Sequence, residues 1–347
     1  MSYQPPYTIT TEILNRVAAI SELIGRLTIL TDRARTLRLR RINRIRTIHG
    51  SLAIEGNTLS ESQITAILEG RRVIAPPREV QEAKNALAAY DRFQTWKPEK
   101  ERDLLEVHQI LMSGLIDEAG LYRQGGVGVM AGQHVIHMAP PASRVPVLMA
   151  DLLDWLVRTE AHPLIVSSIF HYEFEFIHPF ADGNGRLGRM WQSLILSKWN
   201  PLFGDFPVES LVFEHQSEYY LALEESTRQA DSAPFITFML GMILGTLNTV
   251  SSDTANELTP DATPDATPDV TPDVTPDVRL LTVLDGEMTR QKLREALGLS
   301  DDEHFRKAYL IPALEAGLIE MTIPDKPRSS RQKYRLTAKG RQVLATG

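Results

Sequence analysis

The sequence predicts a mainly α-helical protein that carries a second, smaller domain near its C-terminal end. Three observations predict this fold class. Apolar residues recur at helical spacing through much of residues 1–250, one short segment there has the pattern of a β-hairpin, and a proline repeat separates off the last part of the chain. With 347 residues, the chain is long enough for a full hydrophobic core and a second small domain.

The predicted helices of the larger part are amphipathic or wholly apolar. Their apolar positions repeat at helical spacing in residues 13–30, 147–157, 164–176 and 187–196. The most apolar run, 235–247, is too short to cross a bilayer, so we expect a buried helix there. The start, MSYQPPYTIT, lacks the basic-then-apolar pattern of a signal peptide. We therefore expect a cytoplasmic protein with no membrane partner.

Two segments have an alternative interpretation. Residues 127–138 form two short apolar runs around Ala131-Gly132-Gln133 and precede Pro140-Pro141. This pattern predicts a β-hairpin, with an irregular loop as the alternative. Residues 33–46 are rich in arginine and interleaved with leucine and isoleucine. We interpret them as an amphipathic helix whose arginines meet acidic residues elsewhere, with nucleic-acid binding as the alternative.

A repeat marks the predicted domain boundary. Residues 259–278 contain five copies of a four-residue unit that begins Thr-Pro-Asp, and proline with aspartate favours an extended, solvated spacer. We divide the chain into an N-terminal helical region at 1–95, a catalytic core at 96–250, a linker at 251–278 and a C-terminal domain at 279–347. The absence of cysteine excludes disulfides, thiolate zinc sites and cysteine nucleophiles.

The C-terminal domain is predicted to be a winged helix. One helix begins at 280–284, Thr289 caps a second that runs to Gly298, and Ser300 with Glu303 fits the capping box of a third. Pro312 is expected to kink or shorten this third helix. Strands are expected at 318–323 and 334–336, and the wing between and within them is basic. Its positive residues are Lys326, Arg328, Arg331, Lys333 and Arg335.

The net charge of −7 conceals an asymmetry between these parts. Residues 279–347 hold 13 Lys and Arg against 9 Asp and Glu, whereas residues 1–278 hold 24 against 35. The C-terminal domain is therefore able to face a polyanion. This balance permits nucleic-acid binding without demonstrating it.

The segment 176–191, FIHPFADGNGRLGRMW, has the features of a polyphosphate site. Gly183-Asn184-Gly185 favours a tight loop in which backbone N–H groups converge, and an amphipathic run follows directly. We expect this loop at a helix N-terminus, where unpaired amides and the helix dipole favour an anion. Arg186 and Arg189 lie three residues apart, so both guanidinium groups can reach back over the loop to phosphate oxygens.

Two further residues complete a possible mechanism. Asp182 precedes the glycine loop, and a single carboxylate with phosphates and waters is a common magnesium site. His178 titrates near neutrality, so it is a candidate to take a proton from an attacking hydroxyl. Phe180, between them, is expected to anchor the loop in the core. A lone His-Pro or Gly-Asn-Gly usually marks only a turn or a loop, but this order within twelve residues favours a site for a nucleotide triphosphate.

The segment HPFADGNGRLGR resembles the signature of Fic-domain proteins, His-x-Phe-x-Asp/Glu-Gly-Asn-Gly-Arg-x-x-Arg, and matches every fixed position. The similarity extends over about residues 38–246, and an appended winged helix is familiar in bacterial members. The resemblance implies a Fic-type helical bundle whose hairpin is a flap that holds the target protein by strand addition. Most members transfer AMP from ATP to a hydroxyl side chain of a target protein, so the resemblance implies a protein adenylyltransferase that uses ATP and Mg²⁺.

Carried over residue by residue, the resemblance implies a role for each position. His178 would be the general base and Asp182 the magnesium ligand. The nucleotide would lie along the whole run Gly183, Asn184, Gly185, Arg186, Leu187, Gly188 and Arg189, with the 183–185 amides and Asn184 on the α- and β-phosphates and the two arginines on the outer phosphates. Residues 135–138 would form the nucleotide-side edge of the flap. Tyr219-Tyr220 is similar to a tyrosine pair near the adenine of relatives, which places Tyr220 at the nucleotide; two core aromatics are the alternative.

Residues 51–57, SLAIEGN, resemble the inhibitory motif of the family, Ser/Thr-x-x-x-Glu-Gly/Asn. In relatives that carry it, the glutamate enters the nucleotide site and pairs with the second signature arginine, which implies a contact between Glu55 and Arg189 here. A carboxylate on that guanidinium excludes the γ-phosphate position. The resemblance therefore predicts autoinhibition and low basal activity.

Other functions remain open at the level of sequence. The same site is compatible with removal of AMP, because a glutamate beside it can position a water. A different class is a DNA-binding regulator, in which the basic wing binds phosphates and the helical domain senses a ligand. Winged helices also dock proteins. The partners considered are thus a target protein at the flap, DNA or a protein at the winged helix, and a second copy of the chain in a homodimer.

Overall fold

The computed structural model describes residues 3–30, 33–131 and 134–256 of the larger part and, of the smaller part, residues 280–281, 283–284, 286–297, 305–315, 317–322 and 332–341. The chain divides into two units, Met1–Pro260 and Asp261–Gly347, each with its own hydrophobic core. The spacer predicted at 259–278 lies outside the described residues. Residues 251–256, which we assigned to the linker, are helical instead, because helix α11 (Ala233–Asn256) continues through them.

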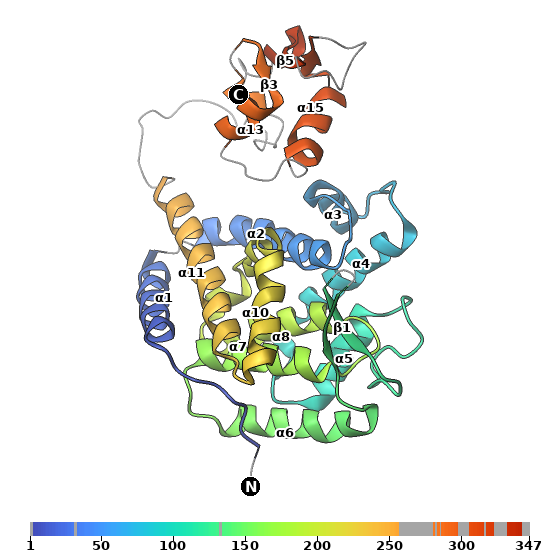
Figure 1. Ribbon diagram of the computed structural model, residues 1–347, viewed down its shortest axis with the longest axis vertical. Coiled ribbons are helices and arrows are strands. Elements are labelled where there is room, and N and C mark those ends of the chain that lie inside the picture. The colour runs from blue at the N-terminus through green and yellow to red at the C-terminus, as the bar shows by residue number, and fades with distance from the viewer. Residues whose placement is uncertain are drawn as a thin grey trace. The chain divides into compact units, whose positions relative to one another are not determined.

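Two consecutive helices form the centre of the larger unit, α7 (Pro163–Ile177) and α8 (Asn184–Trp199) (Figure 1). Most of both helices is buried, and the buried residues include polar side chains such as Glu175 of α7 and Arg189 of α8. Helices α6 (Val145–Arg158) and α11 pack against α7, whereas α5 (Glu101–Leu111) packs against α8. The short connection between α7 and α8 is the segment that carries the predicted active-site loop.

The N-terminal helices surround this centre. Helix α1 (Thr11–Leu30) packs along α11, and α2 (Arg33–Ile54) packs against α8 and closely against α9 (Val208–Glu214). Gly50 permits that close approach, because a Cβ there would lie 2.7 Å from the backbone of Glu209. Helix α3 (Glu61–Leu68) begins with a capping box formed by Ser60 and Gln63. Helices α4 (Pro77–Asp91) and α10 (Gln216–Gln229) complete the unit, the former against α5 and the latter against α11.

Helix α11 is longer than the apolar run that predicted it. By length and composition, Ala233–Ser251 is a helix that could cross a membrane, and 44% of it is buried inside the protein. Its buried side chains, which include Phe235, Leu240 and Leu247, belong to the same core as α7. The expectation of a buried helix is confirmed for this face, but the argument from shortness was wrong, since polar residues extend the helix at its C-terminal end.

The predicted hairpin is confirmed. Strand β1 (Gly128–Ala131) pairs antiparallel with β2 (His134–Met138), with an irregularity in register between Val129 and Met130. The interpretation of this segment as an irregular loop is therefore wrong. The turn residues Gly132 and Gln133 lie outside the described residues. Strand β2 contacts helix α10.

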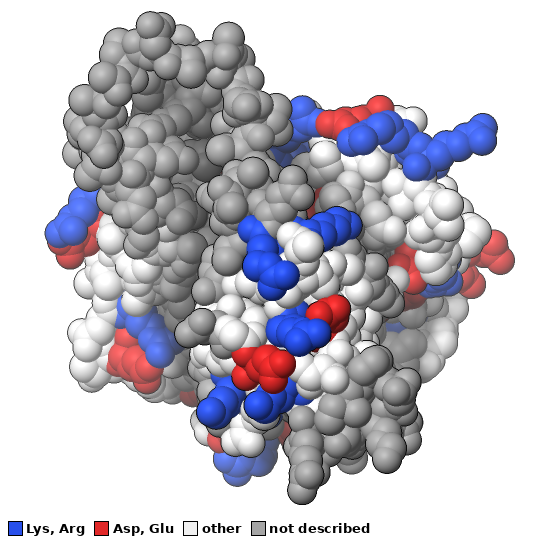
Figure 2. Space-filling model, turned by 90° about the horizontal axis from the view of Figure 1, so that it is seen from above, with Lys and Arg blue, Asp and Glu red and all other residues white. Residues whose placement is uncertain are grey.

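The arginine-rich segment forms helix α2, and three of its described arginines meet carboxylates of other elements. The nitrogens of Arg40, Arg41 and Arg44 lie 2.8, 2.9 and 2.6 Å from oxygens of Asp205, Glu69 and Asp91, respectively. Figure 2 shows one face of the molecule, on which acidic side chains lie beside basic ones. These pairs agree with the amphipathic-helix interpretation rather than with a nucleic-acid surface.

The smaller unit contains a three-stranded antiparallel sheet in the order β3-β5-β4, formed by β3 (Met288–Thr289), β5 (Lys333–Leu336) and β4 (Ile319–Met321). The expected wing had only two strands, because β3 is too short to give a periodic signal. Helix α13 (Arg290–Ala296) begins as predicted after Thr289, whose Oγ1 accepts a hydrogen bond from the N–H of Lys292 at 3.4 Å.

The helical segment that contains Pro312, which follows α13, is distorted, as predicted. A π-helical turn, η4 (Arg306–Leu310), leads into the short helix α15 (Ile311–Glu315). The proline lacks the N–H that a regular α-helix would use at this point. The capping-box residues Ser300 and Glu303 and the wing residues Lys326, Arg328 and Arg331 lie outside the described residues, so the winged helix stays a prediction.

Candidate active site

His178 lies at the end of α7 in an unusual backbone conformation. Its φ and ψ are 50° and 62°, the left-handed region that non-glycine residues seldom adopt. Its N–H donates to the carbonyl of Phe174 at 2.9 Å, which ends the helix. The imidazole is 18% exposed, and its Nδ1 lies 3.8 Å from a carboxylate oxygen of the buried Glu175. The ring is thus held in the wall of the site and still reaches solvent.

The loop between the two central helices is fixed by a buried aromatic stack. Phe180 is fully buried, as predicted, and its ring lies 3.7 Å from that of His108 on α5. His108 Nδ1 accepts the N–H of Gly120 at 2.8 Å, so its Nε2 carries the hydrogen and donates to the main-chain carbonyl of Asp182 at 2.9 Å. Burial lowers the pKa of His108 to about 4, which agrees with a neutral ring. No sequence signal singled out this histidine.

The side chain of Asn184 shapes the loop through two hydrogen bonds to the backbone. Its side chain is 1% exposed, and it accepts the N–H of Phe180 and donates to the carbonyl of the same residue, both at 2.9 Å. Both polar atoms of the amide therefore have main-chain partners. The tight loop uses this amide to satisfy its buried backbone, and the contact of the Asn184 side chain with the α- and β-phosphates stays a prediction.

Helix α8 begins at Asn184, one residue after Gly183, which has φ 83°. The predicted loop is thus shorter than expected, since Asn184 and Gly185 belong to the first helical turn. The first intrahelical bond runs from the N–H of Leu187 to the carbonyl of Gly183. The N–H groups of residues 184–186 precede that bond, so helix geometry gives them no intrahelical partner. The prediction named the amides of residues 183–185, but the N–H of Gly183 donates to Oδ1 of Asp182 at 2.6 Å.

The carboxylate of Glu55 lies at this helix N-terminus. Its Oε1 is 2.7 Å from Nη2 of Arg189, and a Cβ on Gly185 would overlap it. Arg189 is almost fully buried, and its Nη2 and Nε also donate to the carbonyl oxygen and the hydroxyl of Ser51 at 3.0 and 3.3 Å. Burial by itself would lower the pKa of Arg189, but Glu55 raises it overall. The structure thus brings together the two residues of the predicted inhibitory contact.

Arg186 points to a different partner from the one expected. It is 6% exposed, with Nη2 3.0 Å from Asp182 and Nη1 3.4 Å from Glu82 on α4. We had placed it on the outer phosphates, but its guanidinium is engaged with these two carboxylates. Arg78, also on α4, lies 3.2 Å from the other oxygen of Asp182. Neither Arg78 nor Glu82 carries a motif that would have identified it from sequence.

Two of the proposed nucleotide contacts point into the core. Leu187 is fully buried, and Gly188 faces α7, where a Cβ would lie 2.8 Å from Oε1 of Glu175. Gly188 lies on the face of α8 that packs against α7. The contact of positions 187 and 188 with the nucleotide stays a prediction. Gly188 leaves room there for a buried carboxylate.

The two tyrosines of the pair Tyr219-Tyr220 have different surroundings. Tyr219 is buried and its hydroxyl lies 3.1 Å from Nε2 of His171, so it is a core aromatic. Tyr220 is half-buried, and burial, followed by the negative charge of Glu55, raises its pKa. Gln216 of the same helix donates to the carbonyl of Ile54 at 2.7 Å, which holds α10 beside the inhibitory segment. The contact of Tyr220 with adenine stays a prediction.

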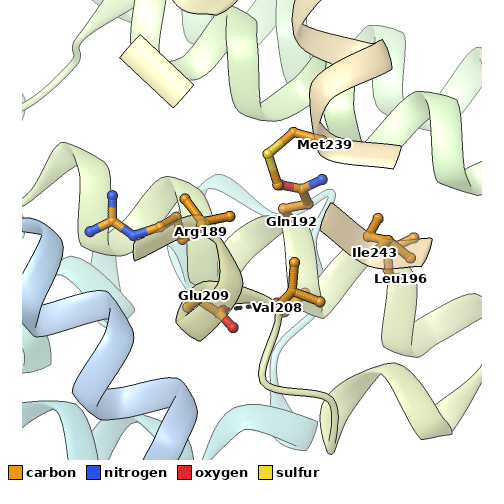
Figure 3. Close-up of a pocket in the computed structure, with 9 residues that line it drawn as sticks. Arg189, Gln192, Leu196, Val208, Glu209, Met239 and Ile243 are labelled. Atoms are coloured by element: carbon orange, nitrogen blue, oxygen red, sulfur yellow. Dashed lines mark hydrogen bonds between the residues drawn. The ribbon is translucent and has the colours of Figure 1, made fainter. Parts of the chain in front are cut away.

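A buried polar layer lies behind the site. Arg189, Gln192 and Glu209 line a small cavity with the apolar side chains of Met239 and Ile243, and Figure 3 shows the guanidinium of Arg189 extending away from that cavity. Ser193 donates to Glu209 at 3.1 Å. Burial raises the pKa of Glu209 to about 7 and that of Glu175 to about 8, and it lowers the pKa of His171 to about 3. Arg189 therefore passes through an unusually polar part of the core.

The fold and this site define a Fic-type enzyme scaffold, and comparisons with known proteins agree. Residues 98–196 match the model of the Fic/DOC family, and residues 276–337 match that of the Fic-like C-terminal domain, described as filamentation induced by cAMP protein Fic-like. The chain is 51% identical to a Fic family protein from Desulfovibrio desulfuricans of known crystal structure, covering 97% of this chain and 99% of that one with a TM-score of 0.71. The chain belongs to the Fic family.

More distant relatives share the helical unit. The Fic-1 protein of Caenorhabditis elegans is 26% identical in its solved structure, over 71% of this chain and 73% of that one, with a TM-score of 0.60. The protein adenylyltransferases Fic of Aedes aegypti and Nematostella vectensis are both 29% identical, over 56% and 55% of this chain. The chain covers only 39% and 45% of those two proteins.

Proposed function

We propose that this chain is a protein adenylyltransferase, which transfers AMP from ATP to a hydroxyl side chain of a target protein and releases pyrophosphate. Relatives named protein adenylyltransferase support the proposal. The observation that carries it is the carboxylate of Glu55 against the first turn of α8 and the guanidinium of Arg189. A carboxylate bound in that place indicates a site built to hold an anion.

The arrangement supports an in-line displacement. His178 takes the proton of the target hydroxyl, the freed oxygen forms a bond to the α-phosphorus, and the bond from that phosphorus to pyrophosphate breaks. The first-turn amides of α8 and the guanidinium of Arg189 hold the phosphates in line once Glu55 has left. The residues of the chain thus contribute mainly orientation and charge neutralisation, which is what this reaction requires.

Asp182 fits the role of a magnesium ligand. Its carboxylate is 39% exposed and is oriented by hydrogen bonds from the N–H of Gly183 and from Arg186. Among the residues that the structure describes, no cluster of three or more acidic or histidine side chains could hold a metal alone. Mg²⁺ is commonly bound by one or two carboxylates together with substrate phosphates, so one carboxylate suffices. Bound there, Mg²⁺ would neutralise phosphate charge, and Asp182 would have to release Arg78.

We further propose that Glu55 keeps the enzyme in a state of low activity. The carboxylate and the γ-phosphate would compete for Arg189, and the carboxylate has the advantage of being part of the chain. Ser51 strengthens this arrangement, since its carbonyl and hydroxyl accept two further hydrogen bonds from the same guanidinium. Displacement of the segment 51–57 would therefore activate the enzyme.

Intact-mass measurement after incubation with ATP and Mg²⁺ tests both proposals. We expect the Glu55→Gly variant to gain AMP on itself or to transfer it to added proteins, and we expect the wild type to do so much more slowly. The double variant Glu55→Gly with His178→Ala should transfer none while still binding ATP. Glu61→Gly, which removes a carboxylate of α3 outside the site, is the matched control and should behave as the wild type. An inert Glu55→Gly variant that binds ATP would refute the transferase proposal.

Binding of DNA by the C-terminal unit is the second candidate function. Of the five basic wing residues, the structure describes Lys333 and Arg335. Arg335 lies 2.8 Å from Glu320 and 3.6 Å from Glu287, and Lys333 lies 3.8 Å from Glu287. These carboxylates reduce the positive charge of the described strand, so we favour a protein partner for this unit. A gel shift of the full chain on duplex DNA at low salt tests the point, and binding that weakens steeply with salt would favour DNA.

A further inference from the structure

Arg123 has no role in the motifs and lies at the junction of the flap and the catalytic segment. It precedes β1, is 3% exposed, and directs its guanidinium to main-chain carbonyls. Nε donates to the carbonyl of His178 at 2.7 Å, and Nη2 donates to that of Ile177 at 3.3 Å. Its own backbone N–H donates to the carbonyl of Pro179 at 2.9 Å. Three consecutive carbonyls around the proposed base thus accept hydrogen bonds from this one residue.

The same guanidinium holds both ends of the flap. Nη1 donates to the carbonyl of Gly125 at 2.8 Å, just before β1, and Nη2 donates to that of Pro140 at 2.6 Å, just after β2. The planar fork of arginine suits several acceptors at fixed angles, whereas the ammonium of lysine is a compact point charge. Carbonyl dipoles provide the environment in which this buried cation is tolerated.

The backbone of His178 needs such a restraint. A non-glycine residue in the left-handed region costs on the order of 1–3 kcal/mol and persists only where its surroundings determine it strongly. Here the N–H of His178 is fixed by Phe174 and its carbonyl is fixed by Arg123. The direction in which the imidazole leaves the backbone therefore depends on Arg123.

We propose that Arg123 is a positioning residue that sets the imidazole of His178 and the flap in one fixed relationship. The inference rests on the proposed transferase function, in which the flap presents the target hydroxyl and His178 deprotonates it. A hydroxyl held by the flap and a base held by α7 come from different segments of the chain. The single guanidinium joins them, so that a target aligned on the flap is also aligned with the base.

The test uses Arg123→Lys in the Glu55→Gly background of the full chain. The lysine keeps the charge but cannot reach all four carbonyls, so we expect AMP transfer to fall by about 100-fold, the effect of a misplacement of about 1 Å. The dissociation constant of ATP with Mg²⁺ should stay the same, because no contact of Arg123 involves α8. Hydrogen–deuterium exchange should accelerate in residues 126–140 and 177–183. The control is Arg44→Lys, which alters a guanidinium bonded to the carbonyl of Leu87 away from the site.

Two results would overturn the inference. One is a transfer rate in Arg123→Lys equal to that of its parent, and the other is a loss of ATP affinity in proportion to the loss of transfer, which would indicate general collapse. If Arg123→Lys does not fold, Pro140→Gly serves as the second variant, because it loosens the flap end that the guanidinium holds. We again expect the rate of AMP transfer to fall while the affinity for ATP stays the same. An unchanged transfer rate in Pro140→Gly also contradicts the inference. If the Glu55→Gly background itself transfers no AMP, the transferase proposal is refuted. Hydrogen–deuterium exchange would still test whether Arg123 restrains the flap and the backbone of His178.

Discussion

Oε1 of Glu55 lies 2.7 Å from Nη2 of Arg189, although 134 residues separate the two in sequence. The contact forms over Gly185, where any larger residue would displace the carboxylate. Arg189 is buried on α8, whereas the side chain of Glu55 at the end of α2 remains 34% exposed. The guanidinium is thus the fixed partner and the carboxylate is the one that can leave.

Removal of the Glu55 carboxylate should strengthen ATP binding. A hydrogen bond to a charged group is worth about 1.5–3 kcal/mol, so Glu55→Gly should lower the ATP dissociation constant by about ten- to a hundredfold. Glu55→Gln should have a smaller effect, because its amide oxygen still accepts a bond from Arg189. Isothermal titration with ATP and Mg²⁺ measures the difference. Equal affinities for the wild type and both variants would exclude competition at this arginine.

The amide of Asn184 should matter for stability. Asn184→Ala leaves the N–H and carbonyl of Phe180 without their partner, and each buried unsatisfied group costs about 1–3 kcal/mol. We expect a clear drop in the midpoint of thermal unfolding. Asn184→Asp keeps the acceptor for the N–H and should be intermediate. If Asn184→Ala instead loses ATP affinity at unchanged stability, the amide contacts phosphate after all.

Glu175 should make stability fall as the pH rises from about 4.5 to 8. Burial raises its pKa from 4.5 to about 8, although Arg189 opposes the shift, so between these values the folded protein binds a proton that the unfolded chain releases. The contribution of this group to the free energy of unfolding therefore decreases as the pH rises from about 4.5 to 8. Glu175→Gln mimics the protonated form and does not titrate.

The measurement is urea unfolding of Glu175→Gln and wild type at several pH values. The variant should gain stability relative to the wild type as the pH rises through this window, and the gain should level off above pH 8. The groups that face Glu175 are His171 on α7, His178 directly after α7, Arg189 on α8, Glu55 directly after α2 and Tyr219 on α10. A difference that does not vary with pH would mean that Glu175 is ionised throughout.

Arg78 should compete with magnesium for Asp182. Their contact is 3.2 Å long and both side chains are well exposed, so the pair is worth about 0.2–1 kcal/mol. Arg78→Gln should lower the Mg²⁺ concentration needed for half-maximal ATP binding by at most about fivefold. Arg26→Gln, which removes an exposed arginine paired with Glu22, is the control. A higher Mg²⁺ requirement in Arg78→Gln would show that Arg78 assists the metal site.

The features of the site that depend on residues close together in sequence could be predicted. Gly183 at a helix start, Phe180 in the core and the hairpin before Pro140 each follow from rules that span a few residues. The contact of Arg186 with Glu82 could not be predicted, because Glu82 comes from α4, far from Arg186 in sequence. His108 and Arg123 were not identified from the sequence, since each acts through main-chain groups and such contacts leave no pattern in the side chains.

The sequence by itself determined the helical periodicity, the hairpin and the order of base, acidic residue and glycine turn, because these depend on neighbours along the chain. It also determined, through the resemblance, which glutamate and which arginine would meet. Only the tertiary structure decided that Asn184 and Gly188 serve the packing of the loop and helices, and that one buried arginine ties the flap to His178. Those roles arise where separate segments bury their polar groups against one another, and the choice of partner there depends on the whole fold.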